Sequence, residues 1–168
     1  MSLPEKIKSV TSSIESMAQK GEVQISTTRG DVQLLVPQAI IHDVLRKLKE
    51  EFGFTYLADM VAADRFTSDD RFEVIWNLVS LKDRMRVFVK TRCSEEKPVL
   101  PTTTDIWQAA NWNEREAYDM FGIQFEGHPD MRRLFLPEDF QYFPLRKEFP
   151  MMGVPGSLEL PTTSPDID

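Results

Sequence analysis

The chain has 168 residues, 41% hydrophobic and 28% charged, which is enough for one globular domain without disulfides or a structural metal. Its 20 Lys and Arg residues stand against 27 Asp and Glu residues, a net charge of -7, so nucleic acid is excluded as the main partner. A single cysteine, Cys93, excludes an internal disulfide and any Cys-ligated iron–sulfur cluster held by this chain alone.

The first half of the sequence predicts helices and strands in a regular order. Apolar residues at three- and four-residue steps predict a helix over residues 4–20, which Gly21 ends. Two short alternating runs, 23–27 and 32–36, predict a hairpin. Pro37 then begins a second amphipathic helix.

Three further strands are predicted at 54–66, 71–80 and 84–92. In the middle run Ile75 and Val79 alternate with larger apolar residues, a pattern compatible with cover on both faces of the sheet. The order helix, two strands, helix, three strands predicts an α+β two-layer sandwich, with a mixed or antiparallel sheet and helices on one face.

A C-terminal helix follows these strands in the prediction. Asn113 is placed to cap it, Glu116 lies at the third position of a capping box, and Gly122 follows the last turn. On this helix Arg115 and Asp119 are four residues apart, so we expect them to pair across one turn.

The end of the sequence is rich in proline, with seven of the 11 prolines between Pro129 and Pro165. Proline interrupts helices and strands, so regular structure is not expected there. We therefore predict an α+β domain over residues 1–126 and an extended tail over 127–168 that docks on partner subunits.

Common catalytic and nucleotide-binding motifs are missing from the sequence: it has no GxGxxG, GxxxxGK[ST], HExxH or GxSxG. Glu114 and Glu116 are two residues apart, and on a helix they point about 200° apart, so they do not form an acid–base dyad. His128 has no convincing partner nucleophile, and a structural hydrogen bond is its simpler role.

Two basic doublets lie in the tail, Arg132 with Arg133 and Arg146 with Lys147, among several aromatic residues. Arginine and aromatic side chains interleaved with proline are typical of an interface anchor. We predict that these residues contact carboxylates or backbone carbonyls of a neighbouring subunit. The alternative is a tail that folds back on its own domain.

The most specific pattern combines the C-terminal helix with the tail. In one register the chain carries Glu114-Arg115-Glu116, Asp119, Met120-Phe121, His128 and Arg132, flanked by ANW, FGI, HPD, LPED and PLRK. With these residues it resembles, over roughly 1–155, the 30-kDa subunit family of proton-translocating NADH:quinone oxidoreductase, respiratory complex I, whose members are the subunits C of these complexes. Phe140 and Phe143 stand where the family commonly has Trp and His.

The resemblance implies a non-redox structural subunit of the hydrophilic arm, which supports NADH-to-quinone electron transfer coupled to proton translocation. Catalytic, cofactor-binding and metal-binding residues are not expected in this chain, because FMN, iron–sulfur clusters and quinone are held by other subunits. The implied partners are the complex I subunits D, B and I, of which D is the chief one. The implied location is peripheral, on the cytoplasmic side of the bacterial inner membrane, with only indirect membrane contact.

Three other interpretations stay open at this point. The first is the equivalent subunit of a membrane-bound hydrogenase, an F420 dehydrogenase or a ferredoxin-dependent photosynthetic complex. The second is a small stand-alone enzyme that uses Glu116, His128 and Asp130. The third is a binding module unrelated to respiration.

Overall fold

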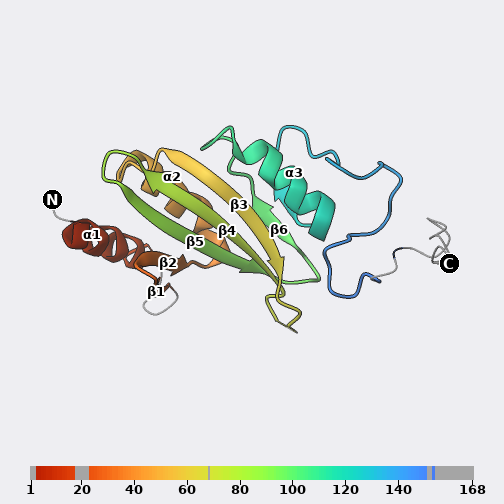
Figure 1. The fold of residues 1–168 in the computed structure, drawn as a ribbon, viewed down its shortest axis with the longest axis horizontal. Helices are drawn as coiled ribbons and strands as arrows, with labels where there is room; N and C mark the ends of the chain where they lie inside the picture. The colour runs from red at the N-terminus through yellow and green to blue at the C-terminus, as the bar shows by residue number, and fades with distance from the viewer. Residues whose placement is uncertain (1–2, 18–22, 68, 151–152, 154–168) are drawn as a thin grey trace, which may run out of the picture.

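The computed structural model describes residues 3–17, 23–67, 69–150 and 153. Figure 1 shows the elements in chain order. They are α1 (Leu3–Glu15), β1 (Gln24–Thr28), β2 (Asp31–Leu35), the 3-10 turn η1 (Gln38–Ile40), α2 (Ile41–Glu50), β3 (Tyr56–Asp64), β4 (Phe72–Ser80), β5 (Met85–Cys93), β6 (Val99–Pro101), α3 (Ala110–Phe121) and β7 (Gln124–Glu126).

The main sheet has five strands in the order β1-β2-β5-β4-β3. Only β2 and β5 run parallel, and the other neighbours are antiparallel. This confirms the predicted α+β fold with a mixed sheet. A second sheet, in which β6 and β7 pair in parallel, was not predicted, because strands of three residues are too short to show a periodicity.

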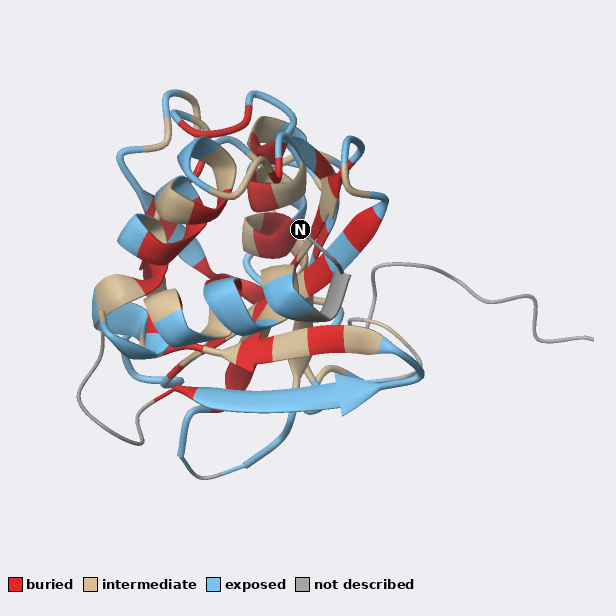
Figure 2. Cartoon of the chain, turned by 90° about the vertical axis from the view of Figure 1, so that its left-hand side faces the viewer, coloured by how far each residue is buried: buried red, intermediate tan, exposed pale blue. Residues whose placement is uncertain are grey.

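The core lies between one face of the main sheet and the helices. Along β4 the alternate residues Phe72, Val74, Trp76 and Leu78 are fully buried, as are the inner residues of α2. Figure 2 shows the buried sides of the helices turned toward the sheet, and β1 exposed along its edge. The single Cys93 is part of this core.

The opposite face of the sheet is covered by polar side chains and not by a helix layer. Ile75 and Val79 are only partly buried there, so cover on both faces is not realised. Glu73 pairs across the strands with Arg92 at 2.9 Å, and Lys90 lies on its other side. This face is therefore a half-buried surface of cross-strand ion pairs.

Two helix ends differ from the prediction. The helix predicted to cap at Asn113 already begins at Ala110, because successive turns after Thr103 lead directly into it. Asn113 instead donates from Nδ2 to Asp59 and to the Met60 carbonyl, which attaches α3 to the edge strand β3. Gly122 ends α3 with a left-handed φ of 78°, as predicted. The predicted end of the first helix, residues 18–21, lies outside the described residues.

The buried face of α2 generates a stability prediction. Leu45 is fully buried, so Leu45→Ala should lower the free energy of unfolding by about 2–5 kcal/mol, from lost burial and the cavity left behind. Glu50→Ala, at an exposed position of the same helix, should change it by at most about 0.5 kcal/mol. Urea unfolding followed by circular dichroism measures both; equal effects would mean that α2 is not docked on the sheet.

Candidate functional site

The residues of the predicted motif gather around α3. Two of its acidic side chains, Glu114 and Asp119, are fully buried, whereas Glu116 is exposed. Buried carboxylates are rare unless hydrogen bonds compensate for lost hydration. The partners of Glu114 and Asp119 therefore define what this helix does.

Glu114 joins α3 to the loop that follows β6. Its Oε1 accepts hydrogen bonds from the backbone N–H and the hydroxyl of Thr103, at 2.6 and 2.7 Å, and its Oε2 accepts one from Thr102 at 2.6 Å. Burial raises the pKa of the Glu114 carboxyl, and these bonds only partly oppose it. Every described contact of this carboxyl is structural.

Asp119 binds the segment that follows β7, residues 127–150, which we term the C-terminal segment. Its Oδ2 accepts hydrogen bonds of 2.7–3.0 Å from three consecutive backbone N–H groups, those of Leu134, Phe135 and Leu136. Its Oδ1 accepts one from Arg133 at 2.7 Å. Burial by itself raises the pKa of Asp119, but the hydrogen bonds from Phe135, Arg133, Leu136 and Leu134 outweigh it and hold the pKa below its usual range.

Arg115 also binds the C-terminal segment, so its predicted pairing with Asp119 is wrong. Its guanidinium donates to the carbonyls of Arg132 and Arg133, each at 3.0 Å, and lies 5.0 Å from the centre of the Trp112 ring. The segment brings Arg133 to Asp119 and leaves two carbonyls for Arg115. Tertiary packing thus replaces the one-turn pair, which is worth only about 0.2–0.5 kcal/mol on a helix surface.

His128 fixes the start of the C-terminal segment. Its Nδ1 accepts a hydrogen bond from the Asp130 N–H at 3.0 Å, and its Nε2 lies 3.2 Å from the Asn111 carbonyl. Because Nδ1 is an acceptor, the proton belongs on Nε2, which donates to the carbonyl. The contacts match the structural role predicted for this histidine.

Arg146 holds the far part of the segment on the domain. Its Nε donates to the Phe121 carbonyl at 2.7 Å, and its guanidinium stacks on the rings of Phe143 and Phe72. Gly122 is required at this contact, because a Cβ there would lie 2.7 Å from the Phe143 ring. Phe143, one of the two departures from the family pattern, is thus packed against the end of α3.

Arg71 is a second centre of charge, which sequence analysis did not single out. It is buried between β3 and the C-terminal segment and binds Asp64 at 2.7 Å, Glu95 at 2.7 Å, and Glu148. The Arg71 hydrogen bond holds the pKa of Asp64 well below its usual range, and the Lys147 N–H adds to it at 2.9 Å. Its only signal in sequence is a lone arginine among the carboxylates of a hairpin turn.

The C-terminal segment therefore lies on its own domain up to residue 150. Arg133 and Arg146 were predicted to meet a neighbouring subunit, and instead they bind groups of this chain. Arg132 pairs with Asp130 and remains exposed, as does Lys147. Docking of the segment on partner subunits stays a prediction.

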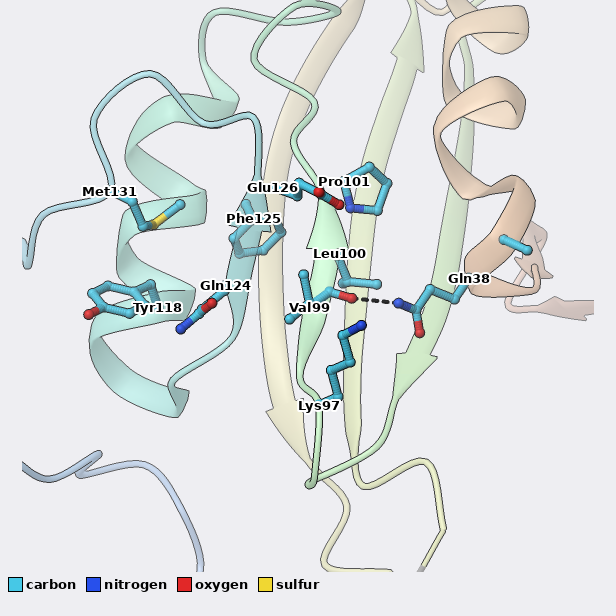
Figure 3. Close-up of a pocket in the computed structure, with 11 residues that line it drawn as sticks. Gln38, Lys97, Val99, Leu100, Pro101, Tyr118, Gln124, Phe125, Glu126 and Met131 are labelled. Carbon is cyan, nitrogen blue, oxygen red and sulfur yellow. Dashed lines mark hydrogen bonds between the residues drawn. The ribbon is translucent and has the colours of Figure 1, made fainter.

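A groove beside β6 and β7 is the largest hollow described, about 940 Å³. Figure 3 shows Tyr118 and Met131 on one side and Gln38 on the other, with Gln38 donating to the Val99 carbonyl at 2.5 Å. The charged residues among those that line it are Lys97 and Glu126. These side chains do not form a nucleophile–base pair.

The described residues carry little that suits cofactor or membrane chemistry. Within 3–17, 23–67 and 69–150, no cluster of His, Cys, Asp and Glu is arranged to hold a metal ion. In the same ranges no helix is both long and apolar enough to cross a membrane. Burial, and then the charge of Asp70, raises the pKa of the Cys93 thiol to about 11, which makes it a poor ligand and nucleophile.

Comparison with known proteins identifies the family. Residues 34–155 match the family model described as "Respiratory-chain NADH dehydrogenase, 30 Kd subunit". Among the NADH-quinone oxidoreductase subunits of Rhizobium meliloti (strain 1021), the one designated C 2 is 41% identical over 151 residues, which cover 85% of this chain and 82% of that protein. The chain belongs to the 30-kDa subunit family of respiratory-chain NADH dehydrogenase.

Other relatives and solved structures agree with this membership. NADH-quinone oxidoreductase subunit 5 of Thermus thermophilus is 43% identical over 135 residues, covering 75% of this chain and 65% of that protein. A solved trypsin-resistant fragment of Nqo5 aligns with a TM-score of 0.65 at 37% identity, over 74% of this chain and 98% of the fragment. A chain of an archaeal membrane-bound sulfane sulfur reductase aligns with a TM-score of 0.74 at 28% identity, over 88% of this chain and 87% of that one.

For this member of the 30-kDa family, the buried Asp119 generates a prediction. Asp119→Asn keeps the shape but removes the charge that four donors share, so it should lower the free energy of unfolding by about 3–5 kcal/mol. Trypsin should then cut first at Arg132 and Arg133. Glu116→Gln, exposed on the same helix, is the control and should match the wild type in both assays.

The same carboxyl predicts an acid response with a defined sign. The folded-state pKa of Asp119 is lowered, so its contribution to stability is present above the unfolded-state pKa of about 3.9 and is lost as the pH falls through the folded pKa. Trypsin-free readouts such as Trp112 fluorescence against pH should show this loss, and Asp119→Asn should show less of it.

Glu114 predicts the opposite pH dependence. Its folded-state pKa is raised, so its contribution is greatest below about 4.3 and is lost as the pH rises through the folded pKa. Glu114→Gln, whose amide can serve both threonines, should flatten this slope at little cost near neutral pH. Glu114→Ala leaves the buried Thr103 N–H without its acceptor and should cost about 1–3 kcal/mol or more. Melting temperatures of the three proteins from pH 4 to 9 provide the measurement.

Proposed function

We propose that this chain acts as a non-redox structural subunit of the hydrophilic arm of NADH:quinone oxidoreductase. In this role it packs on the quinone-reducing module and supports NADH-to-quinone electron transfer coupled to proton translocation. The observation that carries the proposal is that the buried charges of the family motif bind one another's segments. Glu114, Asp119 and Arg115 hold α3, the loop after β6 and the C-terminal segment together.

The proposal extends to cofactors and catalysis. A motif whose charges are engaged in this way supports a chain with no catalytic residues of its own. The buried Cys93 thiol, with its raised pKa, supports a chain that holds no iron–sulfur cluster. FMN, the clusters and quinone are then bound by other subunits of the complex.

The proposed partners are the complex I subunits D, B and I, with D as the chief one and the other two nearby. The proposed location is the cytoplasmic side of a bacterial inner membrane, with contact to the membrane only through the complex. Membership of the family and the names of its relatives, subunits of NADH-quinone oxidoreductases, support an assembly role.

A second candidate is the equivalent subunit of a related membrane complex with another electron donor, such as a hydrogenase, an F420 dehydrogenase or a ferredoxin-dependent photosynthetic complex. The structural similarity to a chain of an archaeal sulfane sulfur reductase favours keeping it. Both candidates place the chain in the same structural role.

One experiment tests the proposal in two arms. A tagged chain purified from native membranes should carry with it the NADH- and flavin-binding subunits and NADH:quinone activity. The chain purified alone should lack visible absorbance, bound flavin and stoichiometric iron. Iron or flavin on the isolated chain would contradict the non-redox role, and co-purified hydrogenase subunits without a flavin-binding partner would favour the second candidate.

A further inference from the structure

Large apolar side chains project from α3 and the C-terminal segment into solvent. Four of them are at least half exposed: Trp112 at 61%, Phe135 at 66%, Tyr142 at 50% and Leu145 at 52%. Isolated exposed apolar residues are ordinary, but a group of large ones on one part of a surface marks an interaction site.

The backbone contacts already described hold these four residues around the second half of α3. The Phe135 N–H binds Asp119, and the Leu145 N–H binds the Met120 carbonyl at 3.2 Å. The Tyr142 carbonyl accepts a hydrogen bond from Arg133, the residue that also binds Asp119. Their backbones are therefore fixed before any partner arrives, which reduces the entropy lost on binding.

Trp112 belongs to the same group through Arg115. The Arg115 guanidinium lies against its ring and also binds the carbonyls of Arg132 and Arg133 in the C-terminal segment. A tryptophan held in this way, with most of its surface exposed, is the type of residue that dominates protein interfaces.

The charges around this apolar group are negative. Glu116, Glu138 and Asp139 are exposed, and none of them forms an ion pair with the described part of the chain. Arg132 is compensated by Asp130, with two hydrogen bonds of 2.7 Å. The exposed Lys147 lies at the far end of the segment, where its backbone binds Asp64. An apolar centre with an acidic rim fits a protein surface and repels anionic lipid.

The open face of the main sheet is a weaker candidate. Its apolar residues Ile75 and Val79 are partly buried, and Glu73 is paired with Arg92 and Lys90. Those charges are already compensated within this chain. The unpaired carboxylates and the most exposed apolar residues occur together only beside α3.

We propose that Trp112, Phe135, Tyr142 and Leu145 form a docking surface for one neighbouring protein subunit. That subunit presents an apolar pocket rimmed by Lys or Arg, the complement of the acidic rim. The proposal rests on the proposed assembly function and specifies where the contact is made. The motif charges point inward and shape this surface, while the apolar side chains beside them make the contact.

The test compares Leu145→Asp and Phe135→Asp with a matched control, Leu81→Asp. Leu81 is 68% exposed in the turn between β4 and β5, at the opposite end of the sheet from the C-terminal segment (Figure 1). Each variant is expressed with the full set of subunits, and complex content is measured on native gels. The first two should lower it by about tenfold, and the control should not. All three isolated chains should keep the wild-type melting temperature, because each site is exposed.

A charge test accompanies the apolar one. Reversal of Glu138 and Asp139 to Lys should reduce complex content in low salt, and rising salt should weaken the wild type more than this variant. Wild-type content for Leu145→Asp and Phe135→Asp, or equal loss for Leu81→Asp, would overturn the docking surface while leaving the assembly function intact. Failure of the wild type to join any complex would overturn the proposed function itself. Binding of the isolated wild type to phosphatidylglycerol vesicles, lost in Phe135→Asp, would replace the protein partner with a lipid surface.

Discussion

One buried carboxylate, that of Asp119, decides how the last part of the chain is arranged. It has no exposed surface, so its charge is tolerated only because three consecutive backbone N–H groups and Arg133 surround it. Neither half of this contact is stable alone: the helix cannot bury the carboxylate without the segment, and residues 134–136 depend on the carboxylate to accept from those N–H groups. Helix and segment therefore fold as one unit.

The remaining contacts of the C-terminal segment extend from this centre. Arg115 takes the two carbonyls just before the bound N–H groups, and Arg146 takes the last carbonyl of α3. Both use the planar arrangement of guanidinium donors, which a lysine cannot reproduce. At the far end Arg71 connects the segment to the β3–β4 hairpin through Glu148 and Asp64. The segment is irregular in backbone yet specified at both ends by charge.

This arrangement places structure and recognition on opposite sides of the same residues. The polar groups of the motif turn inward, where their hydrogen bonds are worth most because water is absent. Apolar rings that would ordinarily be buried turn outward, on a backbone that cannot move away. A member of a large complex benefits from such a division, because the docking surface exists before assembly and costs little entropy when it binds.

Sequence alone determined what depends on local periodicity: the α+β order, the alternation of Phe72, Val74 and Trp76 into the core, and the end of α3 at Gly122. These follow because strand and helix periods, and the left-handed φ of glycine, act over a few residues. Only the tertiary structure decided which charges meet. Asp119 binds Arg133, 14 residues away, and not Arg115; Arg71 binds Glu148, 77 residues away. Spacing on a helix shows which side chains are neighbours on its surface, but whether that surface faces water or another segment is settled by packing, and burial then selects the partner that can satisfy every donor and acceptor.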